Sequence, residues 1–139
     1  MTVHIHAQAS ERRMMPAILN GMRCRCPKCG EGKLFRAFLK VNQACSKCGE
    51  ELFHHRADDL PPYISIVIVG HILVGALLHS EMTMVVAPWV YMVTLVPAAL
   101  ILPLAMLPSV KGGVVGLQWA GRMHGFDPTH RDPALPDEA

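Results

Sequence analysis

Charge is almost absent from the middle of this 139-residue chain: residues 60–110 contain a single charged side chain, Glu81. Glu81 divides this stretch into two apolar runs, each long enough for the roughly 20 residues that a helix needs to cross a bilayer. A soluble core helix of that length normally carries charge on its outer face. The lack of charge therefore argues against an ordinary soluble domain and predicts a transmembrane hairpin within residues 58–110, with spans over 63–80 and 88–107.

Catalytic motifs are also missing. None of the serines has the His and Asp context of an activated nucleophile, and Gly112-Gly113 lacks the sequence frame of a phosphate-binding loop. Residues 1–18 lack the continuous apolar core of a signal peptide. We therefore expect a protein that is not an enzyme, has no small-molecule substrate and carries no secretory leader.

Cysteine, in contrast, is concentrated in one place. Four of the five cysteines form the pairs Cys26-x2-Cys29 and Cys45-x2-Cys48, a spacing typical of a zinc site rather than of a disulfide framework. Four thiolates complete a tetrahedral coordination sphere, so the site is expected to be closed and structural. Iron in a rubredoxin-like site uses similar paired turns and stays open as the alternative. Cys24 is either a spare thiol or a replacement for Cys26 in a shifted register.

Residues 23–57 are expected to form a small zinc ribbon around these cysteines. Gly30 and Gly49, which follow the second cysteine of each pair, permit the positive φ of a tight metal-binding turn. The predicted apolar core consists of Leu34, Phe35, Phe38, Leu39 and Val41. Such a core is too small to fold a module alone, so metal binding must supply much of the folding free energy, roughly 10–16 kcal/mol.

The segments on either side of the ribbon link it to the membrane. Residues 1–22 are predicted to be a tail and a short amphipathic helix, which either lies on an anionic membrane surface or packs on the ribbon. After the ribbon, His54 and His55 are expected at the surface rather than on the metal. Asp59 is expected to be the N-cap of the first span. Asp58 is expected to pair with a basic residue or with a partner.

The second span is expected to end at Pro108. The Lys111-Gly112-Gly113 segment is interpreted as a hinge, with a separate interfacial helix over residues 111–126. Residues 127–139 contain three prolines and no apolar pattern, so they are predicted to be disordered.

His71 lies near the middle of the first span, where ionisable groups are costly and are often functional. It could ligate haem, relay protons, or stay neutral and donate to the second helix, for example to Thr94. We favour the last of these, so that His71 is predicted to be buried against the second helix or a partner. Together with Asp58, Asp59 and His124, it makes up the set of candidate polar contacts.

The basic residues predict the orientation. Residues 1–59 carry ten Lys and Arg, whereas the turn between the spans carries none. The positive-inside rule then places both termini and the ribbon in the cytoplasm, where thiols stay reduced and available to metal. A ribbon that binds nucleic acid is an alternative, but Glu31, Glu50 and Glu51 dilute its positive charge, so no nucleic acid is expected.

Together, these segments resemble an uncharacterised bacterial membrane family, catalogued as domain of unknown function 983. The resemblance covers about residues 21–126 and is carried by residues 25–35, 45–49, 56–59 with Pro62, Gly70-His71, Lys111-Gly112 and 118–126. It implies a zinc ribbon on a two-helix hairpin in the cytoplasmic (inner) membrane, with no established activity. Genes of similar members often lie among those for the haem–copper cytochrome c oxidase and its assembly factors. The resemblance therefore suggests an accessory subunit or assembly factor of that respiratory oxidase.

Overall fold

The computed structural model of the chain describes residues 12–54, 59–123 and 126. Some of the predictions above lie outside these residues and are not tested by the structure. They are the placements of residues 1–9, His55, Asp58, His124 and 127–139.

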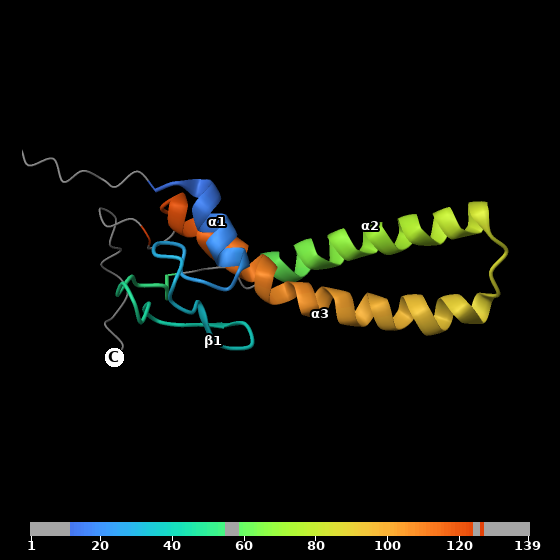
Figure 1. Cartoon of the computed structure of the whole chain (residues 1–139), viewed down its shortest axis with the longest axis horizontal. Helices are drawn as coiled ribbons and strands as arrows, with labels where there is room; N and C mark the ends of the chain where they lie inside the picture. The colour runs from blue at the N-terminus through green and yellow to red at the C-terminus, as the bar shows by residue number, and fades with distance from the viewer. Residues whose placement is uncertain (1–11, 55–58, 124–125, 127–139) are drawn as a thin grey trace, which may run out of the picture.

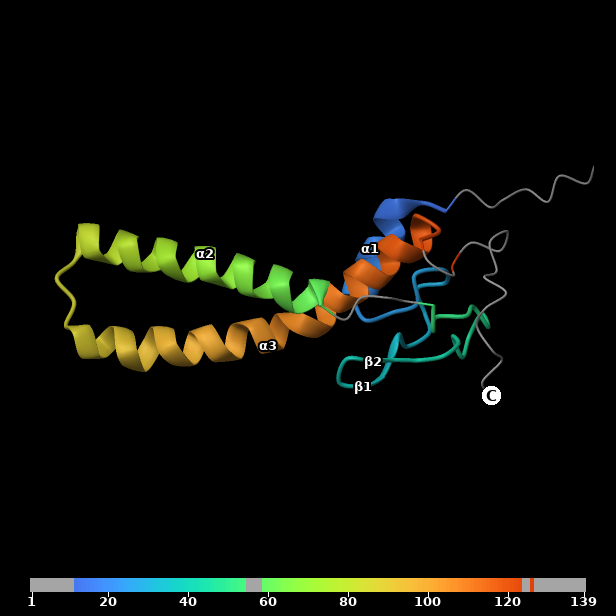
Figure 2. The same ribbon diagram turned by 180° about the vertical axis from the view of Figure 1, so that it is seen from behind.

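The described chain forms helix α1 (Met14–Met22), strands β1 (Phe35–Ala37) and β2 (Lys40–Val41), and helices α2 (Leu60–Thr83) and α3 (Pro88–Ala120). The molecule is elongated (Figures 1 and 2). Helices α2 and α3 make a long hairpin at one end, whereas α1, the ribbon and the last part of α3 gather at the other. We refer to the latter as the compact end.

Helices α2 and α3 are both long and apolar enough to cross a membrane, with a mean hydropathy of 1.9 and 2.2 over their most apolar windows. Few residues of α2 are buried. They form one row near the start of the helix and are Pro61, Ser65 and Val69. Most of the other large apolar side chains of the hairpin are exposed. The hairpin therefore presents an apolar outer surface, as a lipid-facing protein does.

The start and end of α2 differ in detail from the prediction. Asp59 occupies the N-cap position ahead of Pro61 and Pro62, but its side chain makes no capping hydrogen bond. The first span was expected to end at residue 80, but α2 continues to Thr83, and the connection is made by residues 84–87. Both helices are thus longer than the predicted spans, and their connection is still short enough to keep them antiparallel.

The prediction that the second helix ends at Pro108 is wrong. Helix α3 runs without interruption through Pro97, Pro103 and Pro108, so the separate helix expected over residues 111–126 is instead the last part of α3. Figure 1 shows α3 changing direction where it leaves the side of α2, consistent with the kinks that proline introduces. The low helix propensity of glycine favoured a hinge at residues 112–113. The packing of this buried part of α3 stabilises the helix by more than the two glycines cost.

The contact between α1 and α3 depends on glycine. A Cβ on Gly21 would overlap the carbonyl oxygen of Gly112, and one on Gly116 would overlap that of Ala17. Each helix thus has two small residues four positions apart, Ala17 and Gly21 in α1 and Gly112 and Gly116 in α3. They let the two backbones touch, as in close helix pairs of membrane proteins. Neither alternative for the N-terminal helix anticipated this arrangement, because its partner is α3.

The ribbon has few regular strands and a small core. Strands β1 and β2 are antiparallel and are joined by Phe38 and Leu39, with Leu39 at a φ of 60°. Leu34 is fully buried, but Phe38 is 65% exposed, so the prediction that Phe38 belongs to the core is wrong. Leu52, which was not among the predicted core residues, is fully buried and belongs to the core.

Candidate metal centre

Two tight turns bring the cysteines together. In the first, the N–H of Gly30 donates to the carbonyl oxygen of Cys26 at 2.9 Å, and in the second, the N–H of Gly49 donates to that of Cys45 at 2.9 Å. Gly30 and Gly49 have φ of 70° and 72°, which confirms the predicted role of glycine after each cysteine pair.

The four sulfur atoms lie within 4.8 Å of one another. The Sγ atoms of Cys26 and Cys48 are 3.7 Å apart, and so are those of Cys29 and Cys45. An ion bound tetrahedrally at a metal–sulfur distance of about 2.3 Å separates its sulfurs by about 3.8 Å. The geometry therefore fits such an ion, and these four cysteines could bind a metal.

The thiols differ in their readiness to ionise. Burial raises the pKa of Cys26 and of Cys48 above the usual value. In contrast, the backbone N–H of Gly32 stabilises the thiolate of Cys29 and lowers its pKa to about 6. A cation between the sulfurs would supply the charge that allows all four to ionise, because thiolates rather than thiols ligate metals.

Two neighbouring groups lie outside this sulfur cluster. Cys24, at a φ of 58°, follows the residue that caps α1 and is not one of the four. The structure therefore places Cys26, and not Cys24, in the sulfur cluster. The Nε2 atom of His54 lies 3.1 Å from the carboxylate of Glu51, and its ring lies 3.9 Å from that of Phe53. Within the described residues, His54 thus makes a surface contact, as predicted.

Glu50, next to the second turn, connects the ribbon to the rest of the compact end. Its carboxylate accepts hydrogen bonds from Nζ of Lys28 at 2.7 Å and from Nε1 of Trp119, in α3, at 2.8 Å. Arg12 lies 3.7 Å from the same carboxylate, and its guanidinium stands 4.5 Å above the Trp119 ring. Arg12 also donates to the carbonyl oxygen of Trp119 at 2.7 Å. The network therefore joins the ribbon, α3 and the residues before α1.

The charge on Glu50 is stabilised by these contacts. Burial opposes its ionisation, but the hydrogen bonds from Lys28 and Trp119 outweigh that effect and hold its pKa below the usual value. The sequence analysis missed this role, since Lys28, Glu50 and Trp119 are far apart in the chain and no local pattern relates them.

His71 is not paired with the second helix. It is exposed, and its Nδ1–H donates to the carbonyl oxygen of Val67, one turn earlier, at 2.7 Å. Thr94 likewise donates to the carbonyl oxygen of Val90 in its own helix at 2.6 Å. The prediction of a His71–Thr94 contact and of burial against α3 is therefore wrong, because each side chain finds its acceptor within its own helix.

The position of His71 on α2 explains its exposure. It lies two residues beyond the buried Val69, which is about 200° around the helix. Because a carbonyl oxygen only accepts, Nδ1 carries the proton of this hydrogen bond, and Nε2 takes no part in it. His71 thus presents a polar ring on the face of α2 opposite the row that includes Val69.

These features define a class of small proteins in which a four-cysteine metal-binding module is joined to two helices that could cross a membrane. The chain matches the family described as "Protein of unknown function (DUF983)" over residues 35–119, more than half of its length, and belongs to that family. The matched region includes Cys45 and Cys48 and begins after the first cysteine pair. Among curated proteins and solved structures, none matches this chain.

Proposed function

We propose that the protein is a non-enzymatic accessory subunit or assembly factor of a membrane complex. Helices α2 and α3 cross the bacterial inner membrane, and the ribbon lies in the cytoplasm. A structural zinc ion is held by Cys26, Cys29, Cys45 and Cys48. Zinc is the ion that four thiolates in two paired turns bind most often in structural sites.

The metal has a structural role in this proposal. All four positions around the ion are taken by sulfur, so no position remains for a substrate or an activated water. The bound ion stabilises the ribbon, and the Glu50 network holds the ribbon against α3 through Trp119.

The exposed His71 is the observation that carries the proposal. Its ring is exposed near the middle of a helix whose exposed surface is otherwise largely apolar. Surrounded by lipid, the second ring nitrogen, Nε2, would have no hydrogen-bond partner, and such an unsatisfied group is costly. A helix of a partner protein can supply that hydrogen bond, which favours a role inside a larger membrane assembly.

The topology can be tested with reporters of cellular location. Reporters fused at residues 1 and 139 should both be active in the cytoplasm, and one inserted at Glu81 should be active in the periplasm. Opposite locations for the two ends would contradict the two-pass arrangement.

The oxidase is proposed as the partner because of the gene neighbourhood of similar family members. We expect deletion of the gene to lower oxidase activity and the haem a content of membranes. Pulldown from native membranes in mild detergent should recover oxidase subunits. If activity and haem a stay at wild-type levels and no subunit is recovered, the oxidase assignment is wrong and the recovered partner replaces it.

A second candidate function is metal or electron handling, with iron at the cysteines or haem at His71. The sulfur geometry also suits iron. His71 is exposed, and its Nδ1–H donates to a carbonyl oxygen, as the ring of a histidine that ligates a metal through Nε2 commonly does. Optical absorption of the purified protein separates the two candidates, because zinc bound by thiolates gives no visible bands.

A further inference from the structure

Five exposed basic residues lie in the ribbon and in the segment that joins it to α1. Residues 33–41 include Lys33, Arg36 and Lys40 and no acidic residue. Arg23 and Arg25 lie in the segment that leaves α1, and all five side chains are exposed. We call these five residues the basic face.

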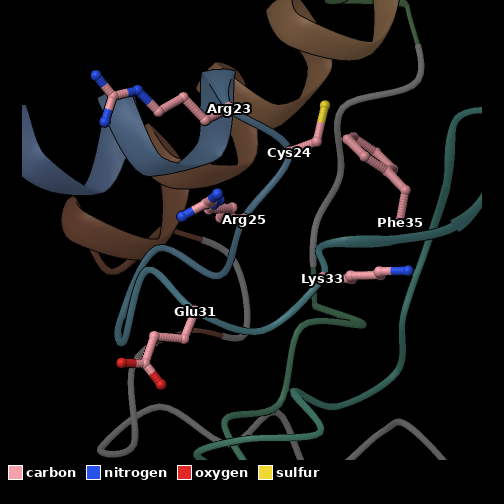
Figure 3. Close-up of a pocket in the computed structure, with 6 residues that line it drawn as sticks. All are labelled: Arg23, Cys24, Arg25, Glu31, Lys33 and Phe35. Atoms are coloured by element: carbon pink, nitrogen blue, oxygen red, sulfur yellow. The ribbon is translucent and has the colours of Figure 1, made fainter.

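Two members of the basic face are held opposite each other. Arg25 and Lys33 form an antiparallel bridge, and like charges directly opposite on paired strands repel. Together with Arg23, they line an open pocket of about 600 Å³, whose other lining residues include Glu31 and Phe35 (Figure 3). The lining carries three positive charges against the one negative charge of Glu31. This net positive charge attracts anions to the pocket.

The basic face lies on the side of the ribbon that is nearer the helical hairpin. In both views the loop between β1 and β2 extends from the ribbon toward the base of the α2–α3 hairpin (Figures 1 and 2). Arg36 and Lys40 flank this loop, and Phe38, at its tip, is 65% exposed. An exposed aromatic residue between two basic ones is the pattern of a segment that enters the headgroup region of a bilayer.

We propose that the basic face rests on the anionic phospholipids of the leaflet next to the ribbon, with Phe38 among the headgroups. Arg25 and Lys33, whose charged ends extend to different sides in Figure 3, would then each lie near lipid phosphate, which offsets their repulsion. This proposal depends on the proposed membrane insertion of α2 and α3, but not on the identity of any partner. Each basic residue near an anionic surface strengthens such binding about fivefold.

The test uses the full chain with its metal, alone in lipid nanodiscs of phosphatidylcholine or of phosphatidylcholine with phosphatidylglycerol. Hydrogen exchange of the amides of residues 36–40 is measured in both. We expect exchange at least fivefold slower in the phosphatidylglycerol discs at low salt, with most of the difference lost at high salt. Inorganic phosphate at millimolar concentration should not reproduce the protection, because the surface recognises many headgroups at once.

Single-charge variants locate the effect. Lys40→Gln should reduce the phosphatidylglycerol-dependent protection about fivefold. Lys47→Gln changes an exposed side chain within the second metal-binding turn, outside the basic face, and should leave the protection unchanged. Equal exchange in the two kinds of disc, or equal effects of the two variants, would overturn the proposal. Failure of the chain to enter discs of either composition would overturn the membrane topology as well, which a loss of lipid selectivity alone would not.

Discussion

Glycines at the two ends of the molecule have opposite surroundings. At the compact end, Gly21 and Gly112 meet each other's backbone so closely that neither has room for a Cβ. In the hairpin, Gly70 and Gly75 have nothing within 4 Å of the place where a Cβ would stand. At the compact end, the glycines are thus covered by other parts of the same chain. The glycines of the hairpin lie at a surface that the chain itself leaves uncovered.

Polar groups show the same contrast. At the compact end, Glu50 is held by partners from distant parts of the chain, including Lys28 and Trp119. In the hairpin, His71 and Thr94 each donate to a carbonyl oxygen one turn earlier in their own helix. Near the connection, the hydroxyl groups of Ser80 in α2 and Tyr91 in α3 lie 3.0 Å apart and form a hydrogen bond between the helices. We infer that the compact end folds through its own contacts and that the hairpin depends on lipid and a partner.

The largest expected effect comes from breaking the metal centre. Cys48→Ser should abolish metal binding and unfold the ribbon, because a structural site of this kind contributes roughly 10–16 kcal/mol. Helices α2 and α3 should still insert. Metal content and hydrogen exchange of residues 23–54 provide the measurement, and Cys24→Ser, outside the sulfur cluster, is the control that should keep the metal. Retention of one metal ion by Cys48→Ser would contradict the four-cysteine site.

The next effect compares two glycines. Gly112→Ala should destabilise the compact end by about 1–3 kcal/mol or more, because its Cβ overlaps the carbonyl of Gly21. Gly75→Ala should be neutral or stabilise α2 by up to about 1 kcal/mol. Denaturant unfolding followed by Trp119 fluorescence, in a Trp89→Phe background, measures both. Equal effects of the two substitutions would remove the contrast between the two ends.

Glu50→Gln is expected to cost about 1–3 kcal/mol at neutral pH, since it removes the charge shared by Lys28 and Arg12. The pKa of Glu50 is lowered in the folded protein, so its contribution is present above the ordinary value of 4.5 and is lost as pH falls through the lowered value. The wild type and the variant should therefore converge in stability in acid. Glu51→Gln, whose parent side chain is 57% exposed, should change stability by less than about 1 kcal/mol.

The smallest effect on the protein itself is expected for His71→Leu. Because His71 is exposed and donates to Val67 of its own helix, insertion should be intact and the free energy of unfolding should change by less than about 0.5 kcal/mol. Recovery of the partner in pulldown should fall. Loss of haem from the purified protein on this change would instead show that His71 is a haem ligand.

Features set by neighbouring residues could be predicted from the sequence. The spacing of Cys26, Cys29, Cys45 and Cys48 indicates the sulfur cluster, because each pair needs only a four-residue turn. Likewise, the helices of the hairpin follow from composition alone. These predictions succeed because they need no knowledge of which distant segments meet.

Features that depend on distant contacts could not be predicted in this way. Gly112-Gly113 has the composition of a hinge, and only the presence of α1 beside it makes a continuous helix more stable. In the same way, nothing near Glu50 in the sequence indicates Trp119 as its partner. Phe38 was expected in the core for its apolar character, but a two-residue loop leaves its side chain outside.

The measurement that tests the contrast between the two ends most directly is chelation of the wild-type protein in nanodiscs. Metal content and hydrogen exchange would be followed together. We predict the release of about one zinc per chain and rapid exchange throughout residues 26–52, while the amides of α2 stay as protected as before. A purified protein without zinc, a ribbon whose exchange is unchanged by metal removal, or equal loss of protection in α2 would contradict the account.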